Sequence, residues 1–316
     1  MAADYLHNHK DFTSLLDIVG EQERILPGLV EKDYWIMHVL NGLKRQGFEF
    51  ELKGGTSLSK GFKIINRFSE DIDIHIKPPA ALKVEENPKK NKPVHIESRR
   101  KFYDWLANEI KIDGITSISR DYAFDNDRFT SGGIRLHYES KTQAIKGVKE
   151  GILLEAGFDT VTPNTNVAIG SWALDGAKDS SVKIIDNTAV DIACYDPGYT
   201  FVEKLQTVVR KYWQEQNDGN ERPNLMRQYY DVYCLLGYEP VQKFIGSENY
   251  LKHKAIRFSA KDSAIPIAEN EAFLLVSRPI RENFRKRYKA TANLYYKGQP
   301  DFDAVLDVIK QHIHRL

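Results

Sequence analysis

Residues 52–76, LKGGTSLSKGFKIINRFSEDIDIHI, constrain the fold of this chain more than any other part of its sequence. They overlap FEFELK (48–53), which alternates apolar and polar residues as a half-buried strand does. Gly54 and Gly55 then predict a turn, TSLSKGFKII (56–65) predicts a helix with a hydroxyl cap, and DIDIHI (71–76) predicts a strand. The sequence therefore predicts two strands joined through a short helix.

The second of these strands carries two aspartates, Asp71 and Asp73, where burial should disfavour charge. Side chains two apart on a strand share a face, so both carboxylates project together, with Ile72, Ile74 and Ile76 on the other face. Two adjacent carboxylates repel unless a cation lies between them. The pair favours a Mg²⁺ site, and a solvent-facing polar surface on an edge strand is the alternative.

The glycines and their neighbours form a candidate phosphate site. Glycine lets a phosphate approach the backbone, and the free N–H groups at a helix start attract its charge. Lys60 faces either the phosphates or solvent, and Arg67 is either a phosphate ligand or a loop charge. The candidate phosphate-binding residues of this segment are Gly54, Gly55, Thr56, Ser57, Lys60, Arg67 and Ser69.

The rest of the chain divides into a mixed part and a helical part. Helices are expected over 11–46 and around RRKFYDWLANEI (99–110), and the Lys- and Pro-rich segment 77–101 is expected to be an exposed insertion. Further strands are expected at GITSISRD (114–121), GGIRLHYES (132–140), GILLEAGF (151–158), SVKIID (181–186) and VDIACY (190–195), the second and third of these forming a hairpin.

The alternation of strands stops at Asp196-Pro197-Gly198, and helical periodicity continues from there to the end. We therefore predict an α/β fold, with a small mixed-sheet domain with N-terminal helices over 1–197 and an all-helical domain over 198–316. The active site is expected in the cleft between these domains.

Composition limits the cellular context. Apolar residues make up 41% and charged residues 28% of the chain, and the net charge is +1, so any attraction to nucleic acid must come from a local patch. Cys194 and Cys234 lack metal-ligand spacing and predict buried, reduced thiols. With a polar N-terminus and no apolar run near 18 residues, we expect a cytoplasmic protein without a membrane segment.

These motifs together resemble the polymerase-beta-like nucleotidyltransferase superfamily, whose signature is Gly-Gly/Ser, a helix and then Asp-x-Asp. More narrowly, the chain resembles the AbiEii/AbiGii group of bacterial toxins over about residues 28–236. The matching segments are VEKDYWIMHVL, RFSEDIDI, TFVEKLQTVVR and RQYYDVYCL.

The resemblance implies roles for residues outside the glycine and aspartate motifs. It implies a third carboxylate metal ligand, for which Glu155 is the better candidate and Asp159 the fallback. Lys204 would contact the nucleotide triphosphate, with Arg210 as a further nucleotide-binding candidate on the same helix. Asp231 would orient Lys204 or bind the nucleotide. The structural alternatives are a solvated helix face for Lys204 and an i,i+4 ion pair with Arg227 for Asp231.

The resemblance also implies an activity: transfer of a nucleotide from an NTP, with Mg²⁺ or alternatively Mn²⁺, to the 3′ end of a tRNA, which blocks translation. Such toxins belong to toxin–antitoxin and phage-defence systems, so the implied partner is an antitoxin encoded alongside. One rival is a nucleotidyltransferase that modifies small molecules such as aminoglycosides. The other is an inactive relative that binds RNA or protein.

A basic segment near the C-terminus, SRPIRENFRKRYKA (277–290), interleaves cations with two aromatic residues. Clustered cations release counterions when they meet a nucleic-acid backbone, and aromatic rings stack on bases. A solvated basic helix face is the alternative. The candidate RNA-binding residues are Arg278, Arg281, Arg285 and Arg287, and the Lys-rich insertion 77–101 is a second candidate RNA contact.

Overall fold

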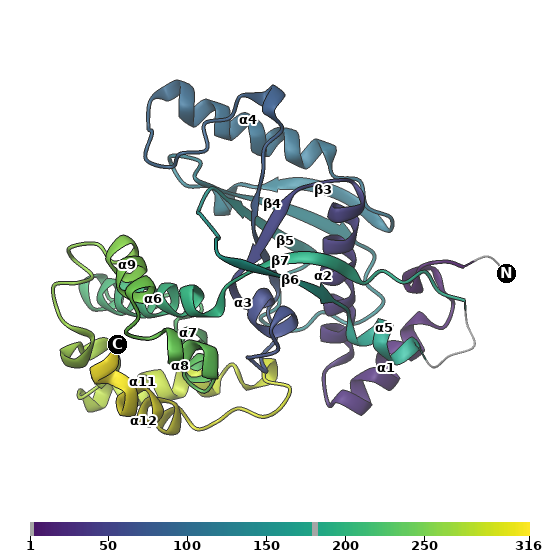
Figure 1. The fold of residues 1–316 in the computed structure, drawn as a ribbon. Helices are drawn as coiled ribbons and strands as arrows, with labels where there is room; N and C mark the ends of the chain where they lie inside the picture. The colour runs from purple at the N-terminus through teal and green to yellow at the C-terminus, as the bar shows by residue number, and fades with distance from the viewer. Residues whose placement is uncertain (1–2, 179–182) are drawn as a thin grey trace. The chain divides into compact units, whose positions relative to one another are not determined.

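A computed structural model describes residues 3–178 and 183–316 of the chain. The contacts between residues divide the chain into two compact units (Figure 1). The first unit contains the chain up to Gly61 together with Phe68–Tyr195, and the second contains Phe62–Arg67 together with Asp196–Leu316. We refer to them as the sheet unit and the helical unit.

The sheet unit is built on one mixed seven-stranded sheet in the order β3-β4-β5-β2-β1-β7-β6. The β2–β5 and β1–β7 pairs are parallel and the other neighbours are antiparallel, with β4 and β5 forming the expected hairpin. A small mixed sheet followed by helices confirms the predicted fold class. The strands are β1 (Phe50–Lys53), β2 (Asp71–Ile76), β3 (Ile115–Asp121), β4 (Ser131–Tyr138), β5 (Ile152–Gly157), β6 (Asn164–Ile169) and β7 (Ala189–Tyr195).

Alternation in β2 separates a core face from a polar face, as its sequence predicts. Ile72, Ile74 and Ile76 are buried with at most 1% of their surface exposed, whereas the residues between them are partly exposed. Neighbouring β5 is more apolar, and its Ile152, Leu153 and Leu154 are all fully buried. Burial of these aliphatic side chains is the main contribution to sheet stability.

Helices pack against the strands of this sheet. Two N-terminal helices occupy the predicted 11–46 range, and the second of them contacts β5 and β7 (Figure 1). The fourth contacts β3 and β4, and it begins at Pro93, inside the segment expected to be an exposed insertion. The helices of this unit are α1 (Phe12–Glu23), α2 (Pro27–Arg45), α3 (Gly54–Thr56), α4 (Pro93–Glu109) and α5 (Trp172–Ala177).

The helical unit has a core rich in aromatic side chains, including Tyr212, Tyr229 and Phe284, which lie edge to face. Its helices are α6 (Pro197–Asp218), α7 (Leu225–Leu236), α8 (Glu239–Phe244), α9 (Glu248–Arg257), α10 (Glu271–Leu274), α11 (Arg278–Lys289) and α12 (Phe302–His312). Asp196 caps α6 by accepting hydrogen bonds from the backbone N–H groups of Gly198 and Tyr199.

A short piece of chain from before β2 belongs to the helical unit. The backbone N–H of Asn66 donates to the Tyr230 hydroxyl at 3.2 Å, and the Tyr296 hydroxyl donates to the carbonyl of Ile65 at 3.1 Å. Arg67 forms an isolated bridge with Tyr295. These contacts are long-range, so the local pattern of 62–67 gives no sign of them.

Three expectations about elements were wrong in detail. The helix after the glycines ends at Gly61 rather than at residue 65, and its second part, Ser57–Gly61, is π-helical. The edge strand β6 was not predicted. In SVKIID, residues 181 and 182 lie outside the described residues, and Ile184 makes only an isolated bridge to Asp4 rather than a strand.

Two further observations bear on context. Cys194 and Cys234 are both free thiols, and Cys194 is fully buried as expected, whereas Cys234 is half-buried rather than buried. Among the described residues, no helix combines the length and the apolar character that crossing a bilayer requires.

Candidate functional site

Three carboxylates of the sheet unit lie on adjacent strands. Asp71 and Asp73 project from the polar face of β2, and Glu155 of β5 is the in-register partner of Asp73. Lys53, at the end of β1, is the partner of Asp73 on its other side. Because in-register residues on neighbouring strands share a face, the two predicted aspartates and Glu155 form one acidic cluster beside a lysine.

The cluster is costly to keep ionised without a counter-charge. Asp71 Oδ1 is buried and has no hydrogen-bond partner. Burial, followed by the Glu70 and Asp73 charges, raises the pKa of Asp71 from its ordinary 3.8 to about 6. Burial and the nearby Asp73 carboxylate likewise raise the pKa of Glu155. A bound cation would relieve this repulsion.

Gly54 is required where β1 turns toward this cluster. Its φ is +74°, a left-handed conformation that glycine adopts at little cost. A Cβ added at this position would lie 2.2 Å from Asp73 Oδ2 and 3.1 Å from Asp73 Cγ. The backbone therefore approaches the metal-site candidate so closely that no side chain fits between them.

The other predicted phosphate-binding residues lie in varied environments. The Thr56 hydroxyl donates to the Asp71 carbonyl at 2.6 Å, so it ties the turn to β2. Gly55 and Ser57 are buried, and Ser69 is half-buried in the segment leading into β2. Asp159, the fallback third ligand, is 3.3 Å from the Lys53 amine.

Lys60 was predicted to face either the phosphates or solvent, but in the structure it forms an ion pair with a buried carboxylate. Its amine lies 2.9 Å from the carboxylate of Asp33, which is 2% exposed, and 4.2 Å from the centre of the Trp172 ring. Asp33 also accepts a hydrogen bond from the Trp172 backbone N–H at 2.9 Å. In this conformation, the positive charge of Lys60 stabilises a contact between α2 and α5.

Sequence reasoning missed two lysines near the acidic cluster, Lys32 and Lys149. Lys32 donates to the carbonyls of Lys149 and Gly151, the latter at 2.9 Å. Burial lowers the pKa of Lys32 to about 8, although the Glu70 and Asp71 carboxylates oppose this change. The exposed Lys149 favours the ionised form of Asp71. Their only sequence signal was a lysine in the helix segment VEKDYW and another in a polar loop.

The acidic cluster fits a magnesium site in part. Its donors are carboxylate oxygens, which Mg²⁺ prefers, and the unpartnered Asp71 Oδ1 is an available ligand. Within residues 3–178 and 183–316, however, no three acidic, histidine or cysteine side chains are close enough to bind one ion together. The fit is thus to a two-aspartate site, since Mg²⁺ commonly binds one or two carboxylates and completes its shell with water and substrate phosphates.

The helical unit contains a second charged group, formed by Arg67, Lys204 and Asp231. Asp231 is fully buried, and both of its oxygens accept from the Arg67 guanidinium at 2.7 Å. The Lys204 amine lies 2.9 Å from Asp231 Oδ2. The structure therefore brings together three residues that were predicted from separate motifs, with Asp231 paired to both cations.

Electrostatics within this group favour the charged forms. Burial alone would lower the pKa of Arg67 and raise the pKa of Asp231. Their mutual attraction outweighs burial, so the pKa of Arg67 is raised and the pKa of Asp231 is lowered. With two cations and one anion, the group keeps one net positive charge, which suits a phosphate ligand.

The remaining candidates lie elsewhere in the helical unit. Arg210 is exposed and lines a cavity along α6. The four arginines predicted to bind RNA lie on α11, and each has an acidic neighbour. Arg278 pairs with Glu282 at 2.9 Å, Arg281 and Arg285 both pair with Asp303, and Arg287 pairs with Glu215 at 2.8 Å.

Comparisons with known proteins agree with these motifs. A family model described as "Nucleotidyl transferase AbiEii toxin, Type IV TA system" matches residues 41–308. No curated protein matches the chain. A solved structure of an antigenic nucleotidyltransferase-like protein from Paracoccidioides brasiliensis is 12% identical, with 87% of this chain and 96% of that chain covered and a TM-score of 0.36.

Proposed function

The chain belongs to the AbiEii nucleotidyltransferase toxin family of type IV toxin–antitoxin systems, and we propose that it is an active, Mg²⁺-dependent nucleotidyltransferase whose acceptor is RNA. The proposed donor is an NTP and the proposed acceptor is a tRNA 3′ end, whose modification would block translation. Beyond family membership, the proposal names the metal, the nucleotide donor and the acceptor.

One observation carries the proposal: two aspartates on one face of β2 beside a glycine turn that leaves no room for a side chain. Asp71 Oδ1 is buried and unpartnered, and the pKa of Asp71 is raised to about 6 because burial and neighbouring acids disfavour its charge. An unsatisfied buried polar atom costs about 1–3 kcal/mol, and more when it belongs to a charged group, so an acid in this position is costly on a purely structural strand face. Function is the better explanation of its presence.

In this proposal, the residues of the chain mainly position charge. Asp71 and Asp73 would hold Mg²⁺, Glu155, the candidate third ligand, would add negative charge beside them, and Lys53 and Lys149 offset the negative charge of the cluster. Bound Mg²⁺ would polarise the α-phosphorus, lower the pKa of the attacking hydroxyl and stabilise the pyrophosphate leaving group. Gly54 and Gly55 let the nucleotide approach the backbone, and Lys204, held by Asp231, binds a phosphate.

The direct test is to incubate the full-length protein with total tRNA, Mg²⁺ and each of the four labelled NTPs in turn. We expect label on tRNA with at least one NTP, and loss of more than about 90% of transfer in Asp71→Asn and in Asp73→Asn, a change of over about 1.4 kcal/mol in the barrier. Asp17→Asn, an exposed carboxylate on α1, is the control and should keep wild-type activity.

Other outcomes would contradict the proposal. Label on an added aminoglycoside with none on RNA would make the protein a small-molecule nucleotidyltransferase. Absence of labelling and of Mg²⁺-dependent NTP binding would identify an inactive relative. Full activity in Asp71→Asn would exclude the aspartate pair as the metal site.

Family membership also supports a partner and a location. We propose that an antitoxin encoded alongside neutralises the protein and that both act in the cytoplasm, where tRNA and NTPs are present. Co-expression of the neighbouring gene should restore growth that expression of this chain alone arrests.

A further inference from the structure

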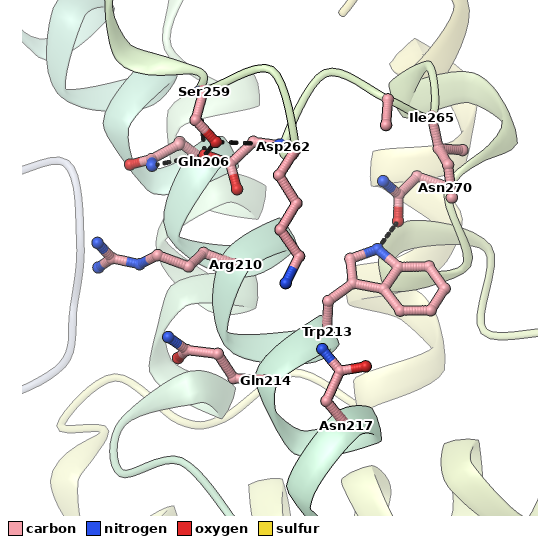
Figure 2. Close-up of a pocket in the computed structure, with 11 residues that line it drawn as sticks. Gln206, Arg210, Trp213, Gln214, Asn217, Ser259, Asp262, Ile265 and Asn270 are labelled. Carbon is pink, nitrogen blue, oxygen red and sulfur yellow. Dashed lines mark hydrogen bonds between the residues drawn. The ribbon is translucent and has the colours of Figure 1, made fainter.

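A cavity of about 530 Å³ lies in the helical unit, between α6 and residues 259–270 (Figure 2). Its size is within the range of small-ligand pockets. Figure 2 shows Trp213 and Asn270 on one side of this hollow and Arg210 and Gln214 on the other. All of its lining residues belong to the helical unit, so the cavity lies within that unit.

The wall formed by α6 is a stripe along one side of the helix. Gln206, Arg210, Trp213 and Asn217 follow one another at intervals of four, three and four residues, which places them on the same face. Lys204 points elsewhere, since its amine pairs with the buried Asp231. One helix thus presents two separate groups of polar residues.

The Trp213 ring is held in place by its surroundings. Its indole N–H donates to Asn270 Oδ1 at 3.2 Å, and Asn270 is 1% exposed and also caps α10 through the Ala272 N–H. Tyr212 packs against the ring edge to face. A half-buried aromatic ring that is fixed in orientation is a ready surface for stacking a planar ligand.

The cavity carries one net positive charge, because its lining has two cations, Arg210 and Lys261, and one acid, Asp262. Asp262 accepts hydrogen bonds from the Gln206 side chain at 3.0 Å and from the Ser259 hydroxyl at 2.9 Å. Arg210 and Lys261, by contrast, are exposed cations for which the described residues provide no hydrogen-bond partner. The cavity therefore offers an incoming anion two cations and, with the Asp262 carboxylate counted, a net charge of +1.

The edge of the cavity adds hydrogen-bonding groups without a fixed charge. Gln214 and Asn217 are exposed carboxamides, each with donors and an acceptor, and no partner for either is found among the described residues. A planar aromatic platform, two cations and two amides form the combination that binds a nucleotide: stacking for the base, charge for the phosphate and amides for the base edge.

We propose that this cavity binds a nucleotide, with the base against Trp213 and the phosphate between Arg210 and Lys261. This inference deepens the proposed function, on which it rests, by adding a nucleotide site distinct from the aspartates of β2. The nucleotide is either one unit of a single-stranded RNA acceptor or a free NTP.

The test measures binding without transfer. In full-length protein carrying Asp73→Asn, we would titrate 5′-fluorescein-labelled hexaadenylate by anisotropy at several salt concentrations, and labelled ATP by equilibrium dialysis. The variants are Arg210→Gln combined with Lys261→Gln, and Trp213→Leu beside Trp213→Phe. The control combines Lys243→Gln with Lys297→Gln, which removes two exposed cations from other parts of the same unit.

If the cavity binds an RNA strand, the double cation variant should bind the oligonucleotide about 10-fold more weakly, with a salt slope about 0.7 flatter for one lost phosphate contact. Trp213→Leu should also bind about 10-fold more weakly, whereas Trp213→Phe, which keeps a ring, should stay within about 3-fold. The control should match the parent protein. The same losses for ATP but not for the oligonucleotide would identify a free nucleotide as the ligand.

The inference is overturned if neither ligand responds to the cation pair, or if Trp213→Phe binds as weakly as Trp213→Leu. The latter result would mean that the ring supports structure through Asn270 rather than stacking. Failure here is distinguishable from failure of the proposed function, because binding is measured in a protein that cannot transfer. If the wild-type protein labels tRNA but every cavity variant binds both ligands normally, the nucleotide site in the cavity is rejected and the proposed transferase activity stands.

Discussion

At the scale of single residues, the position of the Asp73 side chain leaves no room for a side chain at Gly54. The glycine has a φ of +74°, and the aspartate oxygen occupies the space that a Cβ would need. The sequence identified both residues as candidates, because the glycine turn and the Asp-x-Asp spacing are local patterns. Their contact depends on how β1 and β2 pair, and local patterns do not give that register.

Comparing alanine substitutions at Gly54 and Gly47 distinguishes the cost of the Asp73 contact from the cost of backbone strain. Gly54→Ala should destabilise the protein by more than Gly47→Ala, because Gly47 has a similar φ of +82° but no neighbour within 4 Å of its Cβ position. Strain alone costs about 1–2 kcal/mol, and displacement of Asp73 adds to it. Urea unfolding of both variants gives the difference, and equal losses would show that Asp73 moves away freely.

The raised pKa of Asp71 makes stability depend on pH. A carboxyl whose folded-state pKa lies above its unfolded value contributes stability at low pH that is lost as the pH rises through the folded pKa. For Asp71 that range runs from its ordinary 3.8 to about 6. We expect metal-free protein to lose about 1–3 kcal/mol of unfolding free energy from this residue across that range.

Asp71→Asn should remove this part of the pH dependence, because the amide does not ionise. Urea unfolding in EDTA at several pH values between about 4 and 7 measures it, with Asp17→Asn as the control for loss of one exposed carboxylate. Identical profiles for wild type and Asp71→Asn would mean that the surroundings of Asp71 do not raise its pKa. A metal site at Asp71 would then have weaker support.

At the scale of helices and strands, three consecutive charged residues of α2 connect this helix to other parts of the sheet unit. Glu31, Lys32 and Asp33 are each at most 3% exposed, and each binds a different part of the sheet unit. Glu31 accepts from the backbone N–H groups of residues 141 and 142, Lys32 donates to the carbonyls of residues 149 and 151, and Asp33 pairs with Lys60. Buried charges are retained when they are paired in this way.

The same α2 residues show why the site was only partly predictable. Helical periodicity predicts α2 correctly, but it assigns charged positions between apolar ones to solvent. The partners of Lys32 lie more than 100 residues away in the sequence, so no local pattern indicates that it is buried beside Asp71. Edge strand β6 was missed for a related reason, since its burial pattern shows only one buried residue.

The ion-paired group of Arg67, Lys204 and Asp231 joins α6, α7 and the segment before β2, so its variants test the connection between elements. Asp231→Ala should cost about 3–5 kcal/mol in stability, because it removes the carboxylate that offsets the buried charge of Arg67. Lys204→Met should cost about 1 kcal/mol or less, because a neutral buried Arg67–Asp231 pair remains. Urea unfolding of the two variants measures both effects.

Activity distinguishes structure from function in the same group. A folded Lys204→Met protein with strongly reduced nucleotide transfer would support a phosphate-binding role for Lys204. If instead Lys204→Met unfolds as easily as Asp231→Ala, the lysine is a structural element of the ion-paired group and its assignment to the nucleotide fails.

At the scale of the whole molecule, the net charge of +1 means that RNA must be attracted by local groups. The order of mixed and helical segments was predictable, because it follows from periodicity over long stretches. The charge balance of α11 was not. Its arginines form an evident cluster in the sequence, but Asp303 and Glu215, which neutralise much of that charge, come from other helices.

This pairing changes what the basic helix should contribute to RNA binding. Arg281 and Arg285 share Asp303, so the three residues together carry one net positive charge and should neutralise about one phosphate. Combining Arg281→Gln with Arg285→Gln should then flatten the log–log salt dependence of RNA affinity by about 0.7–0.9. Asp303→Asn should steepen it, because it frees both arginines.

Opposite changes in the two variants are therefore the signature of an RNA contact at α11, and RNA affinity measured over a range of salt concentrations reveals them. Loss of fold cannot produce this signature, because it would weaken binding in both. If all three proteins give parallel lines, α11 is a solvated helix face whose charges stabilise the helical unit. The RNA contact would then have to be sought at the cavity beside Trp213 and at the Lys-rich insertion 77–101.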